Sequence, residues 1–203
     1  NVIGTYNCMR AMSEHNVRRL LFASSVAVYH PSTRAHREED FVAPVDIYGQ
    51  SKALAEQLII RASKKFGVDY TIFRIANVYG EHDQNPHLIP EVMHQSSRGN
   101  IIKLGNLDTK RAYIHADDVA HAFEMAISSS RAKNNIYNVG TGIARSVRDV
   151  FNVFNKTQKM RLTLQSAATL RRRQDRPMLR ANIHAIRRDL HWSPNKKFLE
   201  LLS

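Results

Sequence analysis

The spacing of hydrophobic positions in the first part of the chain predicts a helix followed by a buried strand. Apolar residues recur at helical spacing over residues 2–12, so we expect the chain to begin inside or at the start of a helix. A short apolar run at 20–23 ends in Ser24 and Ser25 and is typical of a strand in a parallel sheet. Because ligands of open α/β sheets bind at the carboxyl ends of the strands, the two serines mark a candidate site.

The following segments continue the alternation of helices and strands. A helical pattern covers residues 47–66 and stops at Gly67, a residue type that often ends helices. Apolar runs at 70–76 and 136–139 predict two more strands, and residues 118–127 present an apolar helical face. This order predicts an α/β domain with a mostly parallel sheet.

The second half of the chain contains shorter elements. Residues 80–90 are rich in His, Asn and Pro and predict a loop. The segment from Ser146 to Asp149 resembles a capping box, with Asp in place of the usual Glu, and predicts a helix start. Further helices are expected at 91–97, 183–190 and 196–202, and short strands at 101–104 and 162–164. We expect a smaller, less regular unit that shares a cleft with the first.

The positive charge is concentrated in the last third of the chain. The 203 residues carry 30 Lys and Arg against 18 Asp and Glu, which gives a net charge of +12 and a pI of about 10.1. Residues 1–139 hold 16 basic and 14 acidic side chains, whereas residues 140–203 hold 14 and 4. This distribution favours an anionic partner such as a phosphate ester, nucleotide or nucleic acid, with a solvated basic surface as the alternative.

The rest of the composition excludes several classes of protein. A hydrophobic share of 43% is typical of a globular chain rather than a disordered one. No apolar run approaches the roughly 20 residues that a membrane span needs, and no membrane partner is expected. The single cysteine, Cys8, rules out an internal disulfide and fits a reducing compartment, which we expect to be the cytoplasm.

The most informative chemical pattern is Tyr48-Gly-Gln-Ser-Lys52. Tyr48 and Lys52 are four positions apart in a helical stretch and therefore share one face. An ammonium beside a phenol favours the phenolate, which lets a tyrosine act as acid or base near neutral pH. Ser25, at the preceding strand end, is placed to bridge a substrate oxygen and the phenol. A surface pair of little energetic weight is the alternative, since the chain holds seven tyrosines and 30 basic residues.

Six segments in a fixed order give the sequence its resemblance to a known family. They are NVIGT (1–5), SSVAVY (24–29), YGQSK (48–52), RIANVYG (74–80), RAYIHADDVA (111–120) and YNVGTG (137–142). With them the sequence resembles an extended short-chain dehydrogenase/reductase of the nucleotide-sugar epimerase/dehydratase family. The resemblance implies an NAD(P)-binding Rossmann-type fold, a doubly wound parallel sheet, with a smaller C-terminal α/β substrate domain. We expect residues 1–80 to form the C-terminal half of the dinucleotide-binding domain and residues 81–203 to be mainly substrate-binding, with 111–130 returning to the first domain.

The resemblance also implies roles for individual residues. The catalytic residues would be Ser25, which holds the sugar hydroxyl, Tyr48, the acid/base, and Lys52, which tunes the tyrosine. The cofactor NAD would be held by Ser24, Tyr48, Lys52 and Ile75. A nucleotide-diphosphate sugar would be held by Ser25, Asn77, His87, Leu88, Arg111, Arg172 and Asp175. Guanidinium groups suit phosphate oxygens, so the two arginines would grip the diphosphate.

The implied reaction is epimerisation of a nucleotide-diphosphate sugar of the UDP-glucose/UDP-galactose type by transient hydride transfer. Family dehydratases usually carry Asp-Glu directly after the catalytic Ser or Thr, and related decarboxylases carry Glu at the second position. Here these positions are Val26 and Ala27, which do no acid–base chemistry. Epimerisation is therefore favoured, with another reductase or dehydratase of the family as the alternative.

A second alternative is a non-catalytic Rossmann-like protein that binds a partner through its basic surface. Residues 140–203 hold few aromatic side chains for base stacking, so nucleic acid is the weaker expectation. The presence of Ser25, Tyr48 and Lys52 together favours an enzyme over a binding protein, because a binding protein does not need these three side chains. The resemblance also implies a homodimer of the full-length protein, formed through two helices that include the one bearing Tyr48.

A dinucleotide-binding fold normally begins with a strand and a Gly-x-x-Gly-x-x-Gly turn, with an acidic residue about twenty positions further on. The chain contains no such motif. We therefore expect it to be N-terminally truncated, to bind NAD poorly alone and to lack the residue that selects NAD over NADP. The histidines are dispersed, so no metal is expected; His82 and His87 are interpreted as polar loop residues.

Overall fold

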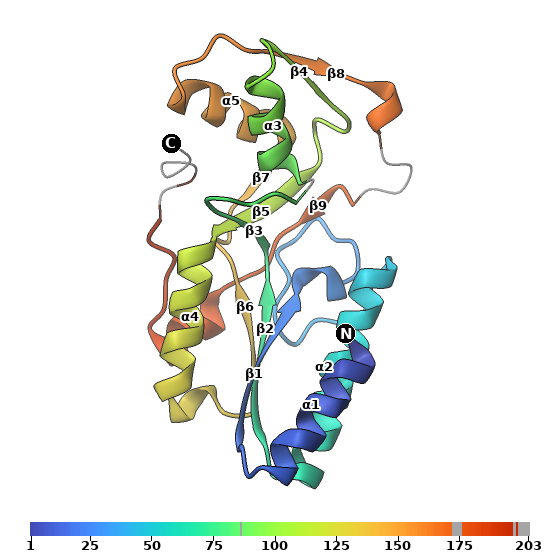
Figure 1. The fold of residues 1–203 in the computed structure, drawn as a ribbon, viewed down its shortest axis with the longest axis vertical. Coiled ribbons are helices and arrows are strands. Elements are labelled where there is room, and N and C mark those ends of the chain that lie inside the picture. The colour runs from blue at the N-terminus through green and yellow to red at the C-terminus, as the bar shows by residue number, and fades with distance from the viewer. Residues whose placement is uncertain (86, 172–175, 197, 199–203) are drawn as a thin grey trace.

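Helices and strands alternate along the chain (Figure 1). The computed structural model describes residues 1–85, 87–171, 176–196 and 198. The α-helices in these residues are α1 (Val2–Glu14), α2 (Ile47–Phe66), α3 (Leu88–Ser96), α4 (Ala116–Ser128), α5 (Val147–Thr157) and α6 (His184–Leu190). The strands are β1 (Arg19–Ser25), β2 (Asp69–Ile75), β3 (Asn77–Tyr79), β4 (Ile101–Leu104), β5 (Lys110–His115), β6 (Asn135–Val139), β7 (Ala144–Ser146), β8 (Thr163–Ser166) and β9 (Met178–Leu179). Short 3-10 helices are η1 (Val26–Val28), η2 (Ser130–Ala132) and η3 (Ala168–Leu170).

The first sheet is parallel and runs in the order β1-β2-β6. In its register Ser25 lies opposite Ile75, and Ile75 lies opposite Val139. The three strands therefore end at the same level, and their carboxyl ends form one edge. The central strand, β2, is buried from Thr71 to Ile75, as expected for a strand covered on both faces.

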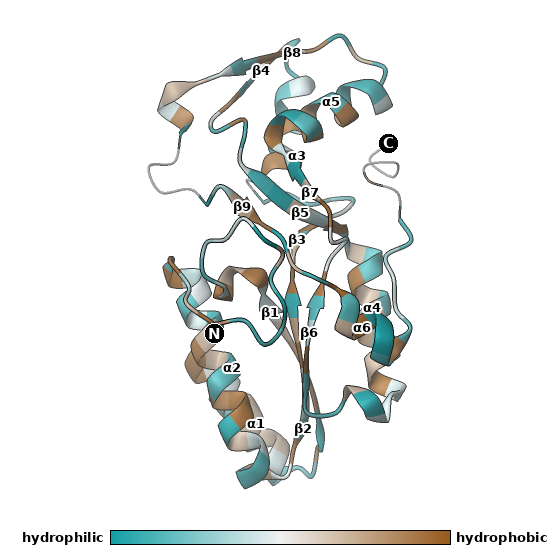
Figure 2. Cartoon of the chain, turned by 180° about the vertical axis from the view of Figure 1, so that it is seen from behind, coloured by the Kyte–Doolittle hydropathy of each residue, from teal (hydrophilic) through white to brown (hydrophobic). Residues whose placement is uncertain are grey.

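Helices cover both faces of this sheet. Ile72 packs with Met9 and Ile59 of α1 and α2, whereas its neighbour Phe73 packs with Ala122 on the side of α4 and α6. Alternate residues of a strand face opposite sides, so one strand supplies both cores. Figure 1 shows α1 and α2 on one side of the sheet and α4 on the other, and Figure 2, seen from behind, shows α6 beside α4.

A second group of elements lies beyond the carboxyl edge of the first sheet (Figure 1). Strands β3, β5 and β7 form a mixed sheet, with β9 also paired to β5, and β4 pairs with β8. Ile102, Phe151 and Phe154 form part of a separate hydrophobic core with α3 and α5. The second group therefore has an apolar core of its own.

The main elements predicted from the sequence are confirmed. Helix α2 has the predicted bounds and ends at Gly67, whose φ of 60° is left-handed and favours glycine. The capping box at Ser146 and Asp149 is present, with both reciprocal hydrogen bonds. The α/β class with a parallel sheet is confirmed as well.

Other elements differ from the sequence predictions. Helix α3 begins at Leu88 rather than at residue 91 because Pro90 is tolerated in the first turn of a helix. Strands β3, β5, β7 and β9 were not predicted. They are short and pair with distant segments, so local periodicity carries little trace of them. Most of the helix expected at 196–202 lies outside the described residues.

The domain division at residue 80 stays a prediction. Helix α4, which lies within the segment expected to return, packs on the first sheet. In the part of the chain that the structure describes, no helix has both the length and the apolar character needed to cross a bilayer.

Candidate active site

The carboxyl edge of the first sheet presents the predicted serine. Ser25 is the last residue of β1 and is half-buried. Its Oγ accepts a hydrogen bond from the backbone N–H of Ala27 at 3.1 Å and so caps η1. Ile75, the last residue of β2, is buried directly opposite. The strand ends thus place Ser25 and Ile75 side by side.

Helix α2 brings the predicted tyrosine to the same edge. Asp46 is the N-cap residue, and its Oδ1 accepts a hydrogen bond from the N–H of Gly49 at 2.6 Å. This cap satisfies a backbone donor that would otherwise be orphaned at the helix start. Tyr48 lies in the first turn and is 53% exposed. Its phenol is therefore accessible to a ligand from outside.

A close contact joins the start of α2 to the segment after Ser25. A methyl group at Gly49 would lie 2.4 Å from the carbonyl oxygen of Ala27 and 2.8 Å from the Cβ of Pro44. Only a glycine permits this approach of the helix to η1. The turn that carries Tyr48 is thus held directly against the turn that follows Ser25.

Lys52 completes the cluster. Its Nζ donates a hydrogen bond to the carbonyl oxygen of Ala23 at 2.7 Å and lies 5.9 Å from the centroid of the Tyr48 ring. It also lies 5.1 Å from the ring centroid of Phe22. Burial lowers the pKa of Lys52, because desolvation disfavours its charged form. The structure therefore brings Tyr48, Lys52 and the end of β1 together, while their catalytic roles stay predictions.

The donor chemistry of this edge fits the nicotinamide ribose of a dinucleotide. The Lys52 ammonium carries three N–H groups, of which the Ala23 carbonyl takes one, so donors remain for ribose hydroxyls. Ile75, opposite Ser25 in the sheet, adds an apolar side chain to this edge. Ser24 differs from Ser25, because it is buried and its hydroxyl donates to Glu56. The contacts of Ser24 and Ile75 with NAD stay predictions.

Beneath the edge lies a buried ion pair that the sequence reasoning missed. Arg74 of β2 contacts Glu56 of α2 at 2.8 Å, and both side chains are at most 4% exposed. Burial acts against the charge of Arg74, but its hydrogen bonds to Glu56 hold its pKa above the ordinary value. The available signal was a charged residue inside the apolar run of β2, and a carboxylate one helical turn after Lys52.

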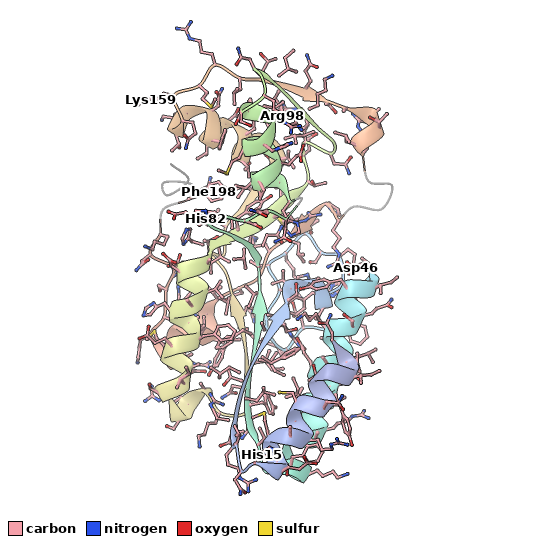
Figure 3. All side chains as sticks on the ribbon, in the orientation of Figure 1. His15, Asp46, His82, Arg98, Lys159 and Phe198 are labelled. Carbon is pink, nitrogen blue, oxygen red and sulfur yellow. The ribbon has the colours of Figure 1, made fainter. Side chains whose placement is uncertain are left out.

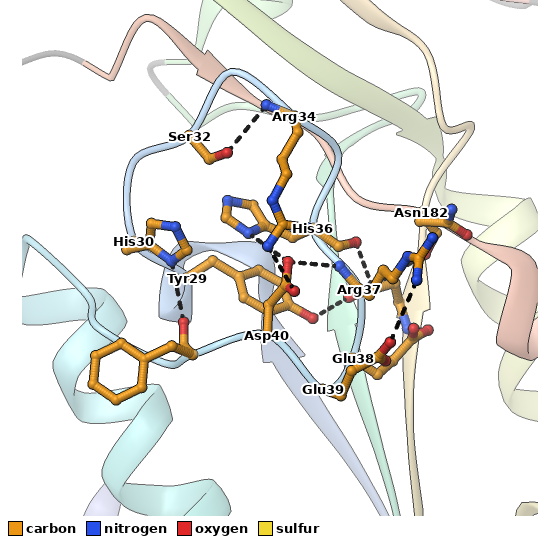
Figure 4. Close-up of polar contacts among 12 residues, drawn as sticks. Tyr29, His30, Ser32, Arg34, His36, Arg37, Glu38, Glu39, Asp40 and Asn182 are labelled. Atoms are coloured by element: carbon orange, nitrogen blue, oxygen red, sulfur yellow. Dashed lines mark hydrogen bonds and ion pairs between the residues drawn. The ribbon is translucent and has the colours of Figure 1, made fainter.

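The loop between β1 and α2, part of which Figure 4 shows, is anchored to Arg74 of this ion pair. Arg74 donates to the hydroxyl of Tyr29 at 3.0 Å, and Tyr29 donates to Asn138 at 2.7 Å. The Tyr29 ring stacks on His36, whose Nδ1 lies 3.2 Å from Asp40. Burial raises the pKa of Tyr29 to about 12 and lowers the pKa of His36. Two of its side chains, Tyr29 and His36, are therefore fully buried, whereas others in the same loop, such as Phe41, are exposed.

Four of the predicted substrate residues lie beyond the sheet edge, in the second group of elements: Asn77, His87, Leu88 and Arg111. Asn77 begins β3 and is exposed, His87 is the N-cap residue of α3, and Leu88 follows it. Arg111 of β5 is half-buried, and its Nη1 donates to the carbonyl oxygens of Lys110 and Arg176, each at 2.8 Å. Arg172 and Asp175 lie outside the described residues. The substrate roles of all six stay predictions.

The described residues hold no group of three or more His, Cys, Asp or Glu side chains arranged to bind a metal ion. The polar side chains near the sheet edge instead bond to one another and to backbone groups, as described for Ser24, Glu56 and Arg74.

A helix-covered parallel sheet with these groups at its carboxyl edge is the arrangement of a Rossmann-type nucleotide-binding protein. Residues 1–140 match the NAD dependent epimerase/dehydratase family. The chain belongs to this family, which confirms the resemblance read from its motifs. NAD is the cofactor of the family, and the expected cofactor is confirmed at this level.

Known proteins of this family are similar to the chain over most of its length. It is 28% identical over 222 residues to a UDP-glucose 4-epimerase of Halalkalibacterium halodurans and 31% identical over 219 residues to one of Streptomyces lividans. Both comparisons cover 100% of this chain and 66% of the relative. A relative from Methanocaldococcus jannaschii is 33% identical over 163 residues, which are 75% of this chain and 51% of that protein. The chain thus spans between about half and two thirds of these relatives.

Solved structures show the same fold. MoeE5, solved with UDP-glucuronic acid and NAD, superposes with a TM-score of 0.90 at 25% identity, covering 100% of this chain and 68% of that one. A UDP-glucose 4-epimerase of Thermotoga maritima, solved with UDP-glucose, gives a TM-score of 0.88 at 22% identity and covers 99% of this chain and 66% of that one. A dTDP-glucose 4,6-dehydratase of Streptomyces venezuelae has a TM-score of 0.88 at 21% identity, covering 100% and 63%. Epimerases and dehydratases therefore share the fold of this chain.

Proposed function

We propose that the protein containing this chain is an NAD-dependent epimerase of a nucleotide-diphosphate sugar, of the UDP-glucose/UDP-galactose type. The observation that carries the proposal is the cluster of Tyr48 and Lys52 on the first turns of α2, held against the end of β1 that bears Ser25. The family membership and the UDP-glucose 4-epimerases among the relatives support it.

The chemistry follows from the positions of the three side chains. Ser24, Tyr48, Lys52 and Ile75 would hold NAD, which would supply reversible hydride transfer at the sugar carbon. Tyr48, accessible at the sheet edge, acts as the base for the proton of the sugar hydroxyl, and the Lys52 ammonium lies 5.9 Å from the centroid of its ring. Ser25 holds the same hydroxyl in place. Lys52 also donates to the ribose of the cofactor.

The substrate would extend from this edge toward the second group of elements. Asn77 begins β3 directly after the end of β2, and Arg111 lies on β5, which pairs with β3. A guanidinium group is well suited to diphosphate oxygens. We propose that Asn77, His87, Leu88 and Arg111 bind the nucleotide-sugar, together with Arg172 and Asp175 outside the described residues.

A reductase or dehydratase of the same family is the second candidate, because dehydratases are among the structures that share the fold. Elimination of water needs an acid–base pair beside the sugar, in addition to the tyrosine. Val26 and Ala27, which follow Ser25, supply none, and Val26 is buried. This absence of acid–base side chains favours epimerisation.

The direct test incubates the full-length protein with NAD and UDP-glucose deuterated at the sugar C4 and follows the products by NMR. The proposal expects UDP-galactose that keeps its deuterium, with no net change in reduced nicotinamide. Loss of water from the sugar would identify a dehydratase, and consumption of added NADH a reductase. Absence of all three reactions, with the protein folded, would favour the non-catalytic alternative.

We also propose that the full-length protein forms a homodimer through α1 and α2 and acts in the cytoplasm. These helices expose large apolar side chains, namely Ile3, Tyr6, Leu54 and Ile60. A group of large exposed apolar side chains favours burial against a partner surface. Sedimentation should give a dimer for the full-length protein and a monomer for Leu54→Glu, and a wild-type monomer would exclude this interface.

Residues 1–203 alone should bind NAD poorly, because the sequence holds no glycine-rich turn for the pyrophosphate. Calorimetric titration of this chain with NAD tests the expectation. Tight binding would contradict it.

A further inference from the structure

Arg176 is a buried arginine next to the candidate site that the sequence analysis did not single out. It is 7% exposed. The carbonyl oxygen of the next residue, Pro177, accepts a hydrogen bond from the N–H of Lys110 in β5 at 2.9 Å. Burying a guanidinium group costs free energy unless acceptors surround it. The hydrogen-bond acceptors around Arg176 therefore show which segments of the chain it connects.

The guanidinium joins two elements that carry site residues. Its Nη2 donates to the carbonyl oxygen of Ala27 at 3.1 Å and to Oδ2 of Asp46 at 2.8 Å. Its Nη1 donates to the carbonyl oxygen of Tyr29 at 3.3 Å. Ala27 lies two residues after Ser25, and Asp46 is the N-cap of the helix that bears Tyr48. Figure 3 shows Asp46 at the end of α2 that faces the second group of elements.

The backbone of Arg176 extends the link to the substrate side. Its carbonyl oxygen accepts a hydrogen bond from Nη1 of Arg111 at 2.8 Å, and β9, which follows, pairs with β5. One residue thus contacts the turn after Ser25, the cap before Tyr48 and the arginine expected at the diphosphate.

We propose that Arg176 is a positioning residue that fixes the catalytic turn of η1 and the first turn of α2 relative to each other and to β5. Its effect on catalysis rests on the proposed function, whereas the link itself does not. Asp46 takes part through both carboxylate oxygens, since Oδ1 caps Gly49 while Oδ2 receives Arg176. Without the guanidinium, Ser25 and Tyr48 keep their own elements but lose one of the restraints between these elements.

The test compares Arg176→Gln and Arg176→Lys with Arg18→Gln in the full-length protein. Arg18 is a matched control because its guanidinium donates to the carbonyl oxygens of Phe66 and Gly67, at the opposite end of α2. With UDP-glucose and NAD, Arg176→Gln should lower kcat by about a hundredfold while KM changes by less than about threefold. Arg176→Lys should recover part of the loss, because its ammonium keeps the charge but reaches fewer acceptors.

Hydrogen exchange gives a second readout that needs no activity. In Arg176→Gln the backbone N–H groups of Ala27 and Gly49 should exchange about tenfold faster, while those in the middle of β2 stay unchanged. Arg18→Gln should leave both amides at the wild-type rate. This pattern supports the link even if the wild-type protein turns over neither UDP-glucose nor UDP-galactose, a result that would count against the proposed function alone.

Three outcomes would overturn the proposal. Unchanged hydrogen-exchange rates of the Ala27 and Gly49 amides in Arg176→Gln would show that Arg176 does not restrain these two turns. If the wild-type protein is active, equal kcat values for Arg176→Gln and Arg18→Gln would show that Arg176 has no role in catalysis. A loss confined to KM would assign Arg176 to substrate binding instead of to positioning.

Discussion

At the scale of single residues, the candidate site combines an exposed reactive side chain with buried supports. Tyr48 is accessible, while the ion pair of Glu56 and Arg74, between α2 and β2, is almost fully enclosed. A buried ion pair is costly to break, because removal of one partner leaves an uncompensated charge. The Tyr-x-x-x-Lys spacing could be read from the sequence, but the buried pair could not, because its two members meet only through packing of α2 on β2.

The raised pKa of Tyr29 predicts a loss of stability at high pH. The neutral phenol is favoured in the fold, so its contribution is complete below the unfolded pKa near 10 and is lost as pH rises toward about 12. A shift of this size corresponds to about 2–3 kcal/mol. Urea unfolding of Tyr29→Phe should therefore show a shallower decline of the free energy of unfolding between these pH values. An unchanged decline would contradict the burial of Tyr29.

Lys52 predicts the alkaline side of the activity profile. Because burial lowers its pKa, the ammonium is lost at a lower pH than that of an exposed lysine, and kcat should fall as pH rises through this value. In Lys52→Arg the positive charge persists, so the fall of kcat should move to higher pH. The maximal kcat should nevertheless be lower, because a guanidinium group has a different geometry from an ammonium group. Lys64→Arg, near the far end of α2, should keep the wild-type profile. An alkaline limb that Lys52→Arg leaves in place would refute this assignment.

At the scale of elements, the contact between α2 and η1 decides the geometry of the site. The sequence predicts both the helix and the strand before it, because each follows from local periodicity and a cap. Their mutual approach depends on Gly49 and on Arg176, far away in the chain, and local patterns contain no information about such a pair. The same reason explains why β3, β5, β7 and β9 were missed.

Gly49→Ala tests this contact. The added methyl group would meet the Ala27 carbonyl, so we expect a loss of about 1–3 kcal/mol in the free energy of unfolding and a lower kcat. Gly4→Ala is the matched control: Gly4 is helical, and a methyl group there has no neighbour within 4 Å among the described residues. It should stabilise α1 by about 0.5–1 kcal/mol. Equal effects of the two substitutions would show that α2 does not press on η1.

At the scale of the whole molecule, the positive charge is only partly explained by the site. Arg111 is proposed to bind the diphosphate, but Arg98 and Lys159 lie just after the ends of α3 and α5, at the far end of the molecule (Figure 3). Net charge can be counted from a sequence, but its distribution over a surface needs the fold. The family motifs predict a site at the sheet edge, and the sheet register explains why the motifs on β1, β2 and β6 meet there.

The most direct test of the central claim is the rate of UDP-glucose epimerisation by the full-length protein with Tyr48→Phe. Removal of the phenolic hydroxyl should lower kcat by about 10²–10⁴-fold and leave KM within about threefold of the wild-type value. Tyr70→Phe, at the amino end of β2 and thus at the opposite edge of the first sheet, should keep full activity. A Tyr48→Phe protein that epimerises UDP-glucose at the wild-type rate would contradict the account.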